Sequence, residues 1–241
     1  MVKMVPDRTG RFAERPHYTP EELDRECERI ISAFLRKRHG ELRFPVTTDE
    51  LNILIEQSGA SLDGYADLTA YGADVEGVTA FFPDKEPEVS ISVRLANDDR
   101  RKNRLRTTLT HEFGHVHLHR HLWAEKLSAG SLFARRAASA DNKAICKRDT
   151  IIDAAQTDWM EWQAGYVSGA ILMPVSHIRR LVADYCQPHG LHGSVHAASE
   201  HAQHLVGAVM DHFAVSEDAA RVRLLKLNLL TTSTQSPSLF G

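Results

Sequence analysis

The sequence predicts a mainly helical α+β protein that carries a small β-hairpin or sheet. Helix-start and helix-stop signals bracket several segments that have apolar residues on one face. Two short β-prone runs flank a polar turn. Of the 241 residues, 42% are hydrophobic, enough to fill a sizeable core. The formal net charge of −3 gives no electrostatic argument for nucleic acid or an anionic membrane as the main partner.

The N-terminal part is expected to contain an arm and two helices. Residues 1–18 carry prolines and charges without periodicity, so we expect a flexible arm. The first helix should follow Thr19, a suitable N-cap that precedes a proline, and should stop at Gly40. A second helix is expected from Thr48 to Gln57.

Two strands and two further helices are expected next. The runs "VTAFF" and "EVSISVRL" flank "PDKEP", a pattern that predicts strands joined by a polar turn. A long helix should start near Asn97 or Asp98. Residues from Ser128 to Lys147 have no clear period and are expected to be mostly loop. The run "DWMEWQAGYVSGAILMP" predicts a helix ended by Pro174, and the polar residues 231–241 predict a disordered tail.

The segment "TLTHEFGHVHLHRH" on the long helix contains five histidines. At about 100° per residue, His111 and His115 lie one turn apart on the same face, so their imidazoles can bind one ion. His119 lies another turn along that flank and is expected beside the ligands. His117 and His121 point to the opposite side.

Glu112 follows the first of these histidines and completes the pattern H-E-x-x-H. On a helix it borders the metal face without sharing its direction, so it can take a proton from water without being a ligand. The pattern is short and also fits surface histidines on a solvated helix. A zinc hydrolase additionally needs a third protein ligand and an open position for water.

Glu161 is the candidate for the third ligand. It begins a face of its helix that continues through Ala164, Gly165 and Ser168, small residues that allow close approach to another backbone. In a competing interpretation, Asp158 caps this helix and Glu161 completes a capping box. We favour the ligand role because the two histidines need a partner, and Asp158 is the reserve candidate.

Three segments together resemble a known family. "RLRTTLTHEFGHVHLH", "EWQAGYVSGAILMP" and "DHFAVSEDAARVRLLKLNLL" follow one another in the order found in the ImmA/IrrE zinc metallo-endopeptidases, bacterial and phage proteins that cleave helix-turn-helix repressors. The resemblance covers roughly Val75 to Leu230. It implies a zincin-like metallopeptidase domain over residues 19–180 and a helix-turn-helix-like region over residues 190–230.

The resemblance also implies roles for individual residues. His111 and His115 correspond to the zinc-binding histidines, Glu112 to the catalytic glutamate and Glu161 to the glutamate ligand. Family members often have two glutamates before an Ala-Asn-x-Phe-Ala run, whereas this chain has Glu161 and Gln163. These two positions lie about 200° apart on a helix, so only one can face the metal, and the charged residue is the better zinc ligand.

Five residues outside this set could also take part in chemistry. His119 and Tyr166 are candidates for stabilising an oxyanion, although core packing is the favoured interpretation of each. Cys146 could compete for zinc as a thiolate, but an inert thiol is favoured. His192 and His196 have helical spacing, yet prolines and glycines surround them and no acidic partner is evident, so a second metal site is not favoured.

The C-terminal segment predicts two helices in a helix-turn-helix-like arrangement. One helix should end near Phe213, and Ser216 is a suitable N-cap for the next. A DNA-reading role would depend on Arg221, Arg223 and Lys226. The acidic start of the second helix is a poor match to phosphate, so a packing or substrate-docking role is favoured over DNA binding.

The sequence thus predicts a cytoplasmic zinc endopeptidase that acts on a regulatory protein, such as a transcriptional repressor. The alternative is a DNA- or protein-binding regulator with a structural or inactive metal site. The start of the chain lacks the apolar core of a secretory signal, and no apolar run approaches the roughly 18 residues that span a bilayer. Three widely spaced cysteines fit reduced thiols better than disulfides. The sequence indicates no oligomeric state.

Overall fold

The structure, a computed structural model, describes residues 2–129, 143–147 and 158–232. As predicted, the fold is mixed α+β and mainly helical. The described helices are α1 (Pro20–His39), α2 (Thr48–Gln57), α3 (Val93–Ala96), α4 (Lys102–Ala129), α6 (Trp159–Leu172), α7 (Val175–Cys186), α8 (Glu200–Phe213) and α9 (Glu217–Lys226). Short 3₁₀ turns occur at Thr69–Tyr71 and Asp99–Arg101. Within these ranges, no helix is long and apolar enough to cross a membrane.

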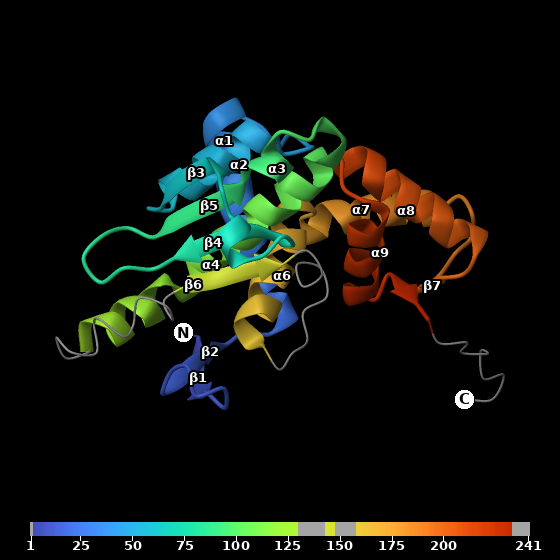
Figure 1. The fold of residues 1–241 in the computed structure, drawn as a ribbon. Coiled ribbons are helices and arrows are strands. Elements are labelled where there is room, and N and C mark those ends of the chain that lie inside the picture. The colour runs from blue at the N-terminus through green and yellow to red at the C-terminus, as the bar shows by residue number, and fades with distance from the viewer. Residues whose placement is uncertain (1, 130–142, 148–157, 233–241) are drawn as a thin grey trace.

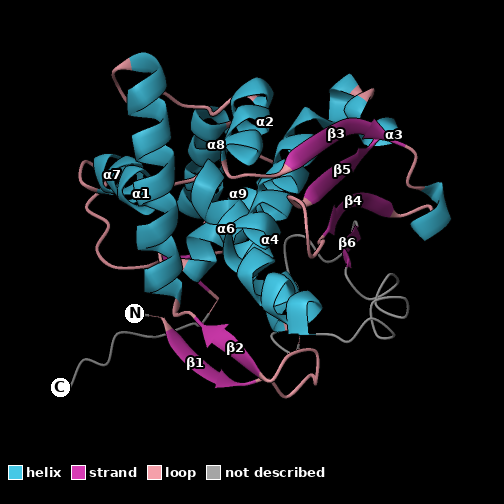
Figure 2. Ribbon diagram, turned by 90° about the vertical axis from the view of Figure 1, so that its left-hand side faces the viewer, coloured by secondary structure: helices cyan, strands magenta, loops and turns pink. Residues whose placement is uncertain are grey.

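The described strands form three small sheets. The strands are β1 (Lys3–Pro6), β2 (Glu14–His17), β3 (Ser61–Ala66), β4 (Val75–Ala80), β5 (Glu88–Ser92), β6 (Lys143–Lys147), β7 (Val195–His196) and β8 (Leu230–Thr231). The largest sheet has the order β3-β5-β4-β6. Figure 2 shows this sheet on one side of α4, with α6 and α1 on the other side, so the long helix lies between the two layers.

The first two helices begin where the sequence predicts. The Thr19 side chain accepts a hydrogen bond from the backbone N–H of Glu22, and the Glu22 carboxylate accepts one from the Thr19 backbone. Gly40 ends α1 with φ 79°, a left-handed conformation that favours glycine. Thr47 caps α2 through the same reciprocal arrangement with Glu50.

The expectation of a flexible N-terminal arm was wrong for residues 2–18. This segment forms the antiparallel hairpin β1–β2, which lies near the start of α6 (Figure 1). The Trp159 indole N–H donates to the Asp7 carboxylate at 3.0 Å. The Phe12 ring meets the edge of the Trp123 ring at 5.0 Å between centroids. These two contacts give the hairpin the apolar and polar partners that its own short strands cannot supply.

The predicted strand pair is present, but it belongs to a larger sheet. β4 and β5 pair antiparallel, with Val78 opposite Ser90. The last residues of "EVSISVRL" form α3, and β4 starts at Val75 and ends at Ala80, before the two phenylalanines. β6 pairs with β4 within a stretch that was expected to be mostly loop, which corrects that expectation for residues 143–147. Residues 130–142 of the same stretch lie outside the described part.

One helix boundary differs from expectation, and one expected domain boundary falls inside a helix. Asp98 caps the 3₁₀ turn by accepting a hydrogen bond from the backbone N–H of Arg100, so α4 starts only at Lys102. α6 ends before Pro174 as predicted, but that proline then serves as the N-cap of α7. The domain boundary expected at residue 180 therefore falls inside α7.

The helices share one hydrophobic core. Its buried members come from the first helix through to the last strand, including Leu23, Phe113, Val167, Phe213 and Leu224. α8 and α9 therefore pack in the same core as α4 and α6. Thr231 of the expected disordered tail lies in β8, and residues 233–241 lie outside the described part.

Candidate metal centre

The structure brings together the three residues predicted as metal ligands. His111 Nε2 lies 3.0 Å from Glu161 Oε2, and His115 Nε2 lies 3.3 Å from Glu161 Oε1. The two Nε2 atoms are 3.1 Å apart. One donor atom from each residue can be chosen so that all lie within 4.8 Å of one another. Both histidines are buried, and the Glu161 side chain is only 13% exposed.

Close packing of α4 against α6 brings these three candidate ligands together. A Cβ added at Gly114, inside the H-E-x-x-H segment, would lie 2.9 Å from the Ala164 Cα, so glycine permits this approach. One turn further along α6, Ser168 Oγ donates to the Thr107 carbonyl at 2.9 Å and lies 2.9 Å from Thr110 Oγ1. As the run of small residues on α6 predicts, this face lies against α4, and Glu161 at its end reaches the histidines.

The competing capping role of Glu161 is wrong. Asp158 is the N-cap of α6, but its side chain makes no capping hydrogen bond. Its carboxylate lies instead 3.7 Å from Arg11 Nη1 at the surface, and it does not belong to the ligand cluster. The Glu161 carboxylate is therefore directed to the histidines, and Asp158 does not share that position.

The charges within the cluster are strongly coupled. Burial alone would raise the pKa of Glu161, but His115 and His111 lower it well below its usual range. Burial alone would lower the pKa of His115, but the Glu161 carboxylate raises it. A positive charge is thus stabilised between two imidazoles and a carboxylate. Protons and a metal cation would compete for the same lone pairs.

The donor set fits a catalytic zinc ion. Two imidazole nitrogens and one carboxylate are three protein ligands, which leaves a fourth position for water. Structural zinc sites are usually closed by additional Cys or His ligands, and neither Cys27 nor Cys186, the described free cysteines, belongs to this cluster. The backbone of Cys146 in β6 pairs with Gly77 of β4, and the Cys146 side chain lies outside the described part.

Glu112 lies beside the cluster but does not belong to it. The residue is fully buried, and its Oε2 accepts a hydrogen bond from the Thr79 hydroxyl at 2.5 Å. Its Oε1 has no hydrogen-bond partner among the described residues. Burial raises the pKa of Glu112, and the nearby His115 and His111 partly offset that rise. A carboxylate with a raised pKa and one unbonded oxygen can serve as a general base.

Sequence reasoning missed the two strand residues that hold Glu112. Thr79 donates to its carboxylate, and a Cβ added at Gly77 would overlap its Oε1 and lie 2.9 Å from its Cδ. Positions 77 and 79 share one face of β4 because side chains alternate along a strand. A glycine inside a predicted strand can signal the close approach of another group, and that signal was available here.

His119 lies directly behind His115, as the helical spacing predicts. Its Nδ1 is 3.1 Å from His115 Nδ1, and its Nε2 is 3.0 Å from Gln163 Oε1. Burial lowers the pKa of His119 well below its usual range, which keeps the ring neutral. Both ring nitrogens are engaged, which disfavours an oxyanion role. The Tyr166 hydroxyl donates to Asp24 Oδ2 at 3.0 Å, so this residue has the favoured core role.

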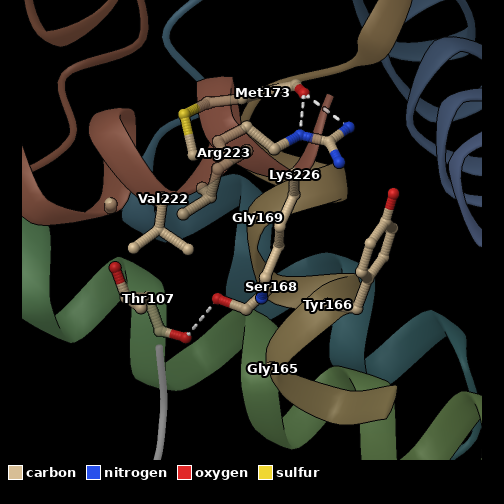
Figure 3. Close-up of a pocket in the computed structure, with 11 residues that line it drawn as sticks. Thr107, Gly165, Tyr166, Ser168, Gly169, Met173, Val222, Arg223 and Lys226 are labelled. Carbon is tan, nitrogen blue, oxygen red and sulfur yellow. Dashed lines mark hydrogen bonds between the residues drawn. The ribbon is translucent and has the colours of Figure 1, made fainter. Parts of the chain in front are cut away.

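Arg223, one of the residues on which DNA reading would depend, points into the protein. It is 2% exposed, donates two hydrogen bonds of 3.2 Å to the Met173 carbonyl and pairs with Asp24 at 2.7 Å. Figure 3 shows it beside a small pocket between α4, α6 and α9, with Lys226 extending past Tyr166. α8 and α9 are present with Ser216 as the predicted cap. Their arrangement does not present Arg223 to a phosphate.

The second histidine pair does not form a metal site in the described structure. His196 lies in β7 and His192 precedes it outside any helix, so the helical spacing on which the idea depended does not exist. The cluster of His111, His115 and Glu161 is the one that the described residues provide.

The fold and the site define a mainly helical α+β protein with a buried His–His–Glu cluster and a separate buried glutamate beside it. No family model matches this chain, and a search of curated proteins finds no significant match. Its function must therefore be argued from the geometry of this site and from the sequence motifs.

Proposed function

We propose that this protein is a zinc-dependent endopeptidase that hydrolyses a peptide bond in a regulatory protein. The observation that carries the proposal is the position of Glu112. It lies fully buried one residue from a ligand, yet it is bonded to Thr79 and not to the ligand cluster. A structural metal site has no use for such a carboxylate, whereas hydrolysis requires a base beside the ion.

The residues divide the work of hydrolysis between them. His111, His115 and Glu161 would hold the ion, and a bound zinc would lower the pKa of a water molecule toward neutrality and polarise the scissile carbonyl. Glu112 would accept the proton from water at its unbonded Oε1 and pass it to the leaving amine. The Thr79 hydroxyl holds the other oxygen, which fixes the orientation of the carboxylate.

The proposed substrate class comes from the resemblance to the ImmA/IrrE metallo-endopeptidases. That resemblance suggests a helix-turn-helix transcriptional repressor encoded near this protein. The alternative, a DNA- or protein-binding regulator with a structural or inactive metal site, leaves Glu112 without a role. Burial of Arg223 further weakens the DNA-binding form of that alternative.

Incubation of the purified protein with the neighbouring repressor tests the proposal. We expect discrete repressor fragments to accumulate with zinc-loaded protein, to disappear after chelation and to return when zinc is restored. Repressor that stays intact with fully zinc-loaded protein, while repression is nonetheless relieved in cells, would favour the regulator alternative.

A further inference from the structure

The Gln163 side chain is held in one orientation by the N-terminal hairpin. Its Nε2 lies 2.9 Å from the Pro16 carbonyl oxygen. A carbonyl can only accept a hydrogen bond, so the amide nitrogen must face Pro16 and the amide oxygen must face the other way. That oxygen lies 3.0 Å from His119 Nε2. His119 must therefore carry its proton on Nε2.

This proton position determines the next one along the chain of contacts. A neutral imidazole with its proton on Nε2 has a lone pair on Nδ1. In His119 that Nδ1 lies 3.1 Å from His115 Nδ1, so His115 must be the donor and carry its proton there. In the neutral ring, the form that binds a metal, the lone pair of His115 is then on Nε2, the atom that lies 3.3 Å from Glu161 Oε1.

We propose that Gln163 and His119 are positioning residues that select the metal-binding tautomer of His115, and that the Pro16 carbonyl anchors this relay. Gln163 and both histidines are almost completely buried, at 1% exposed or less, so water does not readily replace the missing partner. The hairpin is itself held to α6 by the bond between Asp7 and Trp159. The N-terminal hairpin is thus part of the metal site, although none of its residues is a ligand.

His111 provides an internal contrast. Its Nε2 also faces the cluster, but its Nδ1 has no hydrogen-bond partner among the described residues. Hydrogen-bonded partners of metal-binding histidines fix the ring and the tautomer, and their loss typically lowers metal affinity about 10- to 100-fold. The relay through His119 should therefore act on His115 alone.

The tautomer can be measured directly in the metal-free protein by ¹⁵N NMR of the histidine rings. In the wild type, at a pH above the raised pKa of His115 where the ring is neutral, we expect its proton on Nδ1. In Gln163→Leu, which keeps the side-chain size but removes the acceptor, we expect His115 to populate the Nε2–H tautomer, while His111 is unchanged. A folded Gln163→Leu protein with the wild-type His115 tautomer would overturn the proposal.

Zinc affinity, measured by competition with a chelator, is the second readout. We expect Gln163→Leu to bind zinc about 10- to 100-fold more weakly than the wild type. If Gln163→Leu fails to fold, two variants at position 119 provide the same test. His119→Gln offers an amide oxygen to His115 and should bind zinc within a few-fold of wild type, whereas His119→Phe offers no acceptor and should lose affinity. Equal affinities for this pair would overturn the proposal.

The inference rests on the same metal site as the proposed peptidase function, but its test does not require cleavage. A protein that shows the tautomer and affinity changes yet cleaves no repressor would support the relay and contradict only the peptidase function. If the wild type cleaves a repressor but folded Gln163→Leu keeps the wild-type zinc affinity, the peptidase function is supported and the relay is contradicted.

Discussion

Glu112 Oε1 occupies the space that a Cβ at Gly77 would need, so even the smallest side chain there would overlap the carboxylate. The contact joins the centre of the long helix to the strand beside it. Because the Thr79 hydroxyl holds the other oxygen, two residues of β4 together set the position of the proposed base.

Gly77→Ala is therefore expected to displace Glu112 without removing a metal ligand. We predict that zinc content stays near wild type, that the free energy of unfolding falls by about 1–3 kcal/mol, as in other overpacked sites, and that peptide hydrolysis falls sharply. Gly64→Ala is the matched control because Gly64 lies in β3 of the same sheet and a Cβ there meets nothing within 4 Å. Equal activity of the two variants would contradict the role assigned to Gly77.

The ligand assignment predicts a clear pattern of metal content. His111→Ala, His115→Ala and Glu161→Ala should each lose most of the zinc, because each removes one of three protein ligands. Asp158→Ala should keep it, since that carboxylate lies outside the cluster. Metal analysis of the purified proteins after dialysis measures this directly. Zinc lost from Asp158→Ala and kept by Glu161→Ala would mean that the wrong carboxylate of α6 has been assigned.

Removal of the charge on Asp24 should destabilise the protein strongly. Asp24 is the partner of the buried Arg223, and breaking a buried ion pair by removing one member typically costs about 3–5 kcal/mol. We predict a loss of this size in urea unfolding of Asp24→Asn. In Glu217→Gln, which removes a mostly exposed partner of Arg221, the loss should stay below about 1 kcal/mol. Comparable losses in both variants would argue against the buried pair as a stabilising contact.

The coupled cluster predicts how stability depends on pH in the metal-free protein. The pKa of Glu161 is lowered, so its contribution is present above its unfolded pKa of about 4.3 and is lost as pH falls through the lower folded value. The pKa of His115 is raised, so its contribution is present below its unfolded pKa of about 6.5 and is lost as pH rises through the higher folded value. The contributions of Glu161 and His115 are therefore both present between the two unfolded pKa values, about pH 4.3 to 6.5.

The difference in Tm between metal-free wild type and Glu161→Gln should therefore be largest between about pH 4.3 and 6.5 and should shrink toward pH 8. The increase in Tm caused by added zinc should become larger as pH rises above about 6, because protons then compete less for the ligands. Thermal unfolding across this range, with and without zinc, measures both. A Tm difference that is independent of pH would show that Glu161 and His115 are not coupled.

Local periodicity placed His111 and His115 on one helical face, and the need for a third, charged partner selected Glu161. The angle between Glu161 and Gln163 on α6 showed that only one of them can face the histidines, and charge favoured Glu161. The small residues on that helix also predicted its close contact with α4. These features depend on neighbours within one or two turns, which the sequence displays directly.

The residues that orient the site come from distant segments and could not be predicted in the same way. The Thr79 hydroxyl reaches Glu112 from a strand, and the Pro16 carbonyl that binds Gln163 is a backbone group with no signal in the side-chain pattern. The first residues appeared irregular because their short strands are stabilised by contacts with Trp123 and Trp159, which lie far along the chain. Such partners follow from the tertiary fold and not from local preference.

The most direct measurement of the central claim compares wild type with Glu112→Gln for zinc content and repressor cleavage in the same preparation. The substitution is isosteric and can keep the contact with Thr79, so zinc content and Tm should match wild type. Cleavage should fall by about 10²- to 10⁴-fold, the usual loss for a positioned base. Undiminished cleavage by zinc-loaded Glu112→Gln would contradict the role of Glu112 as the base and, with it, the account of this protein as a zinc endopeptidase.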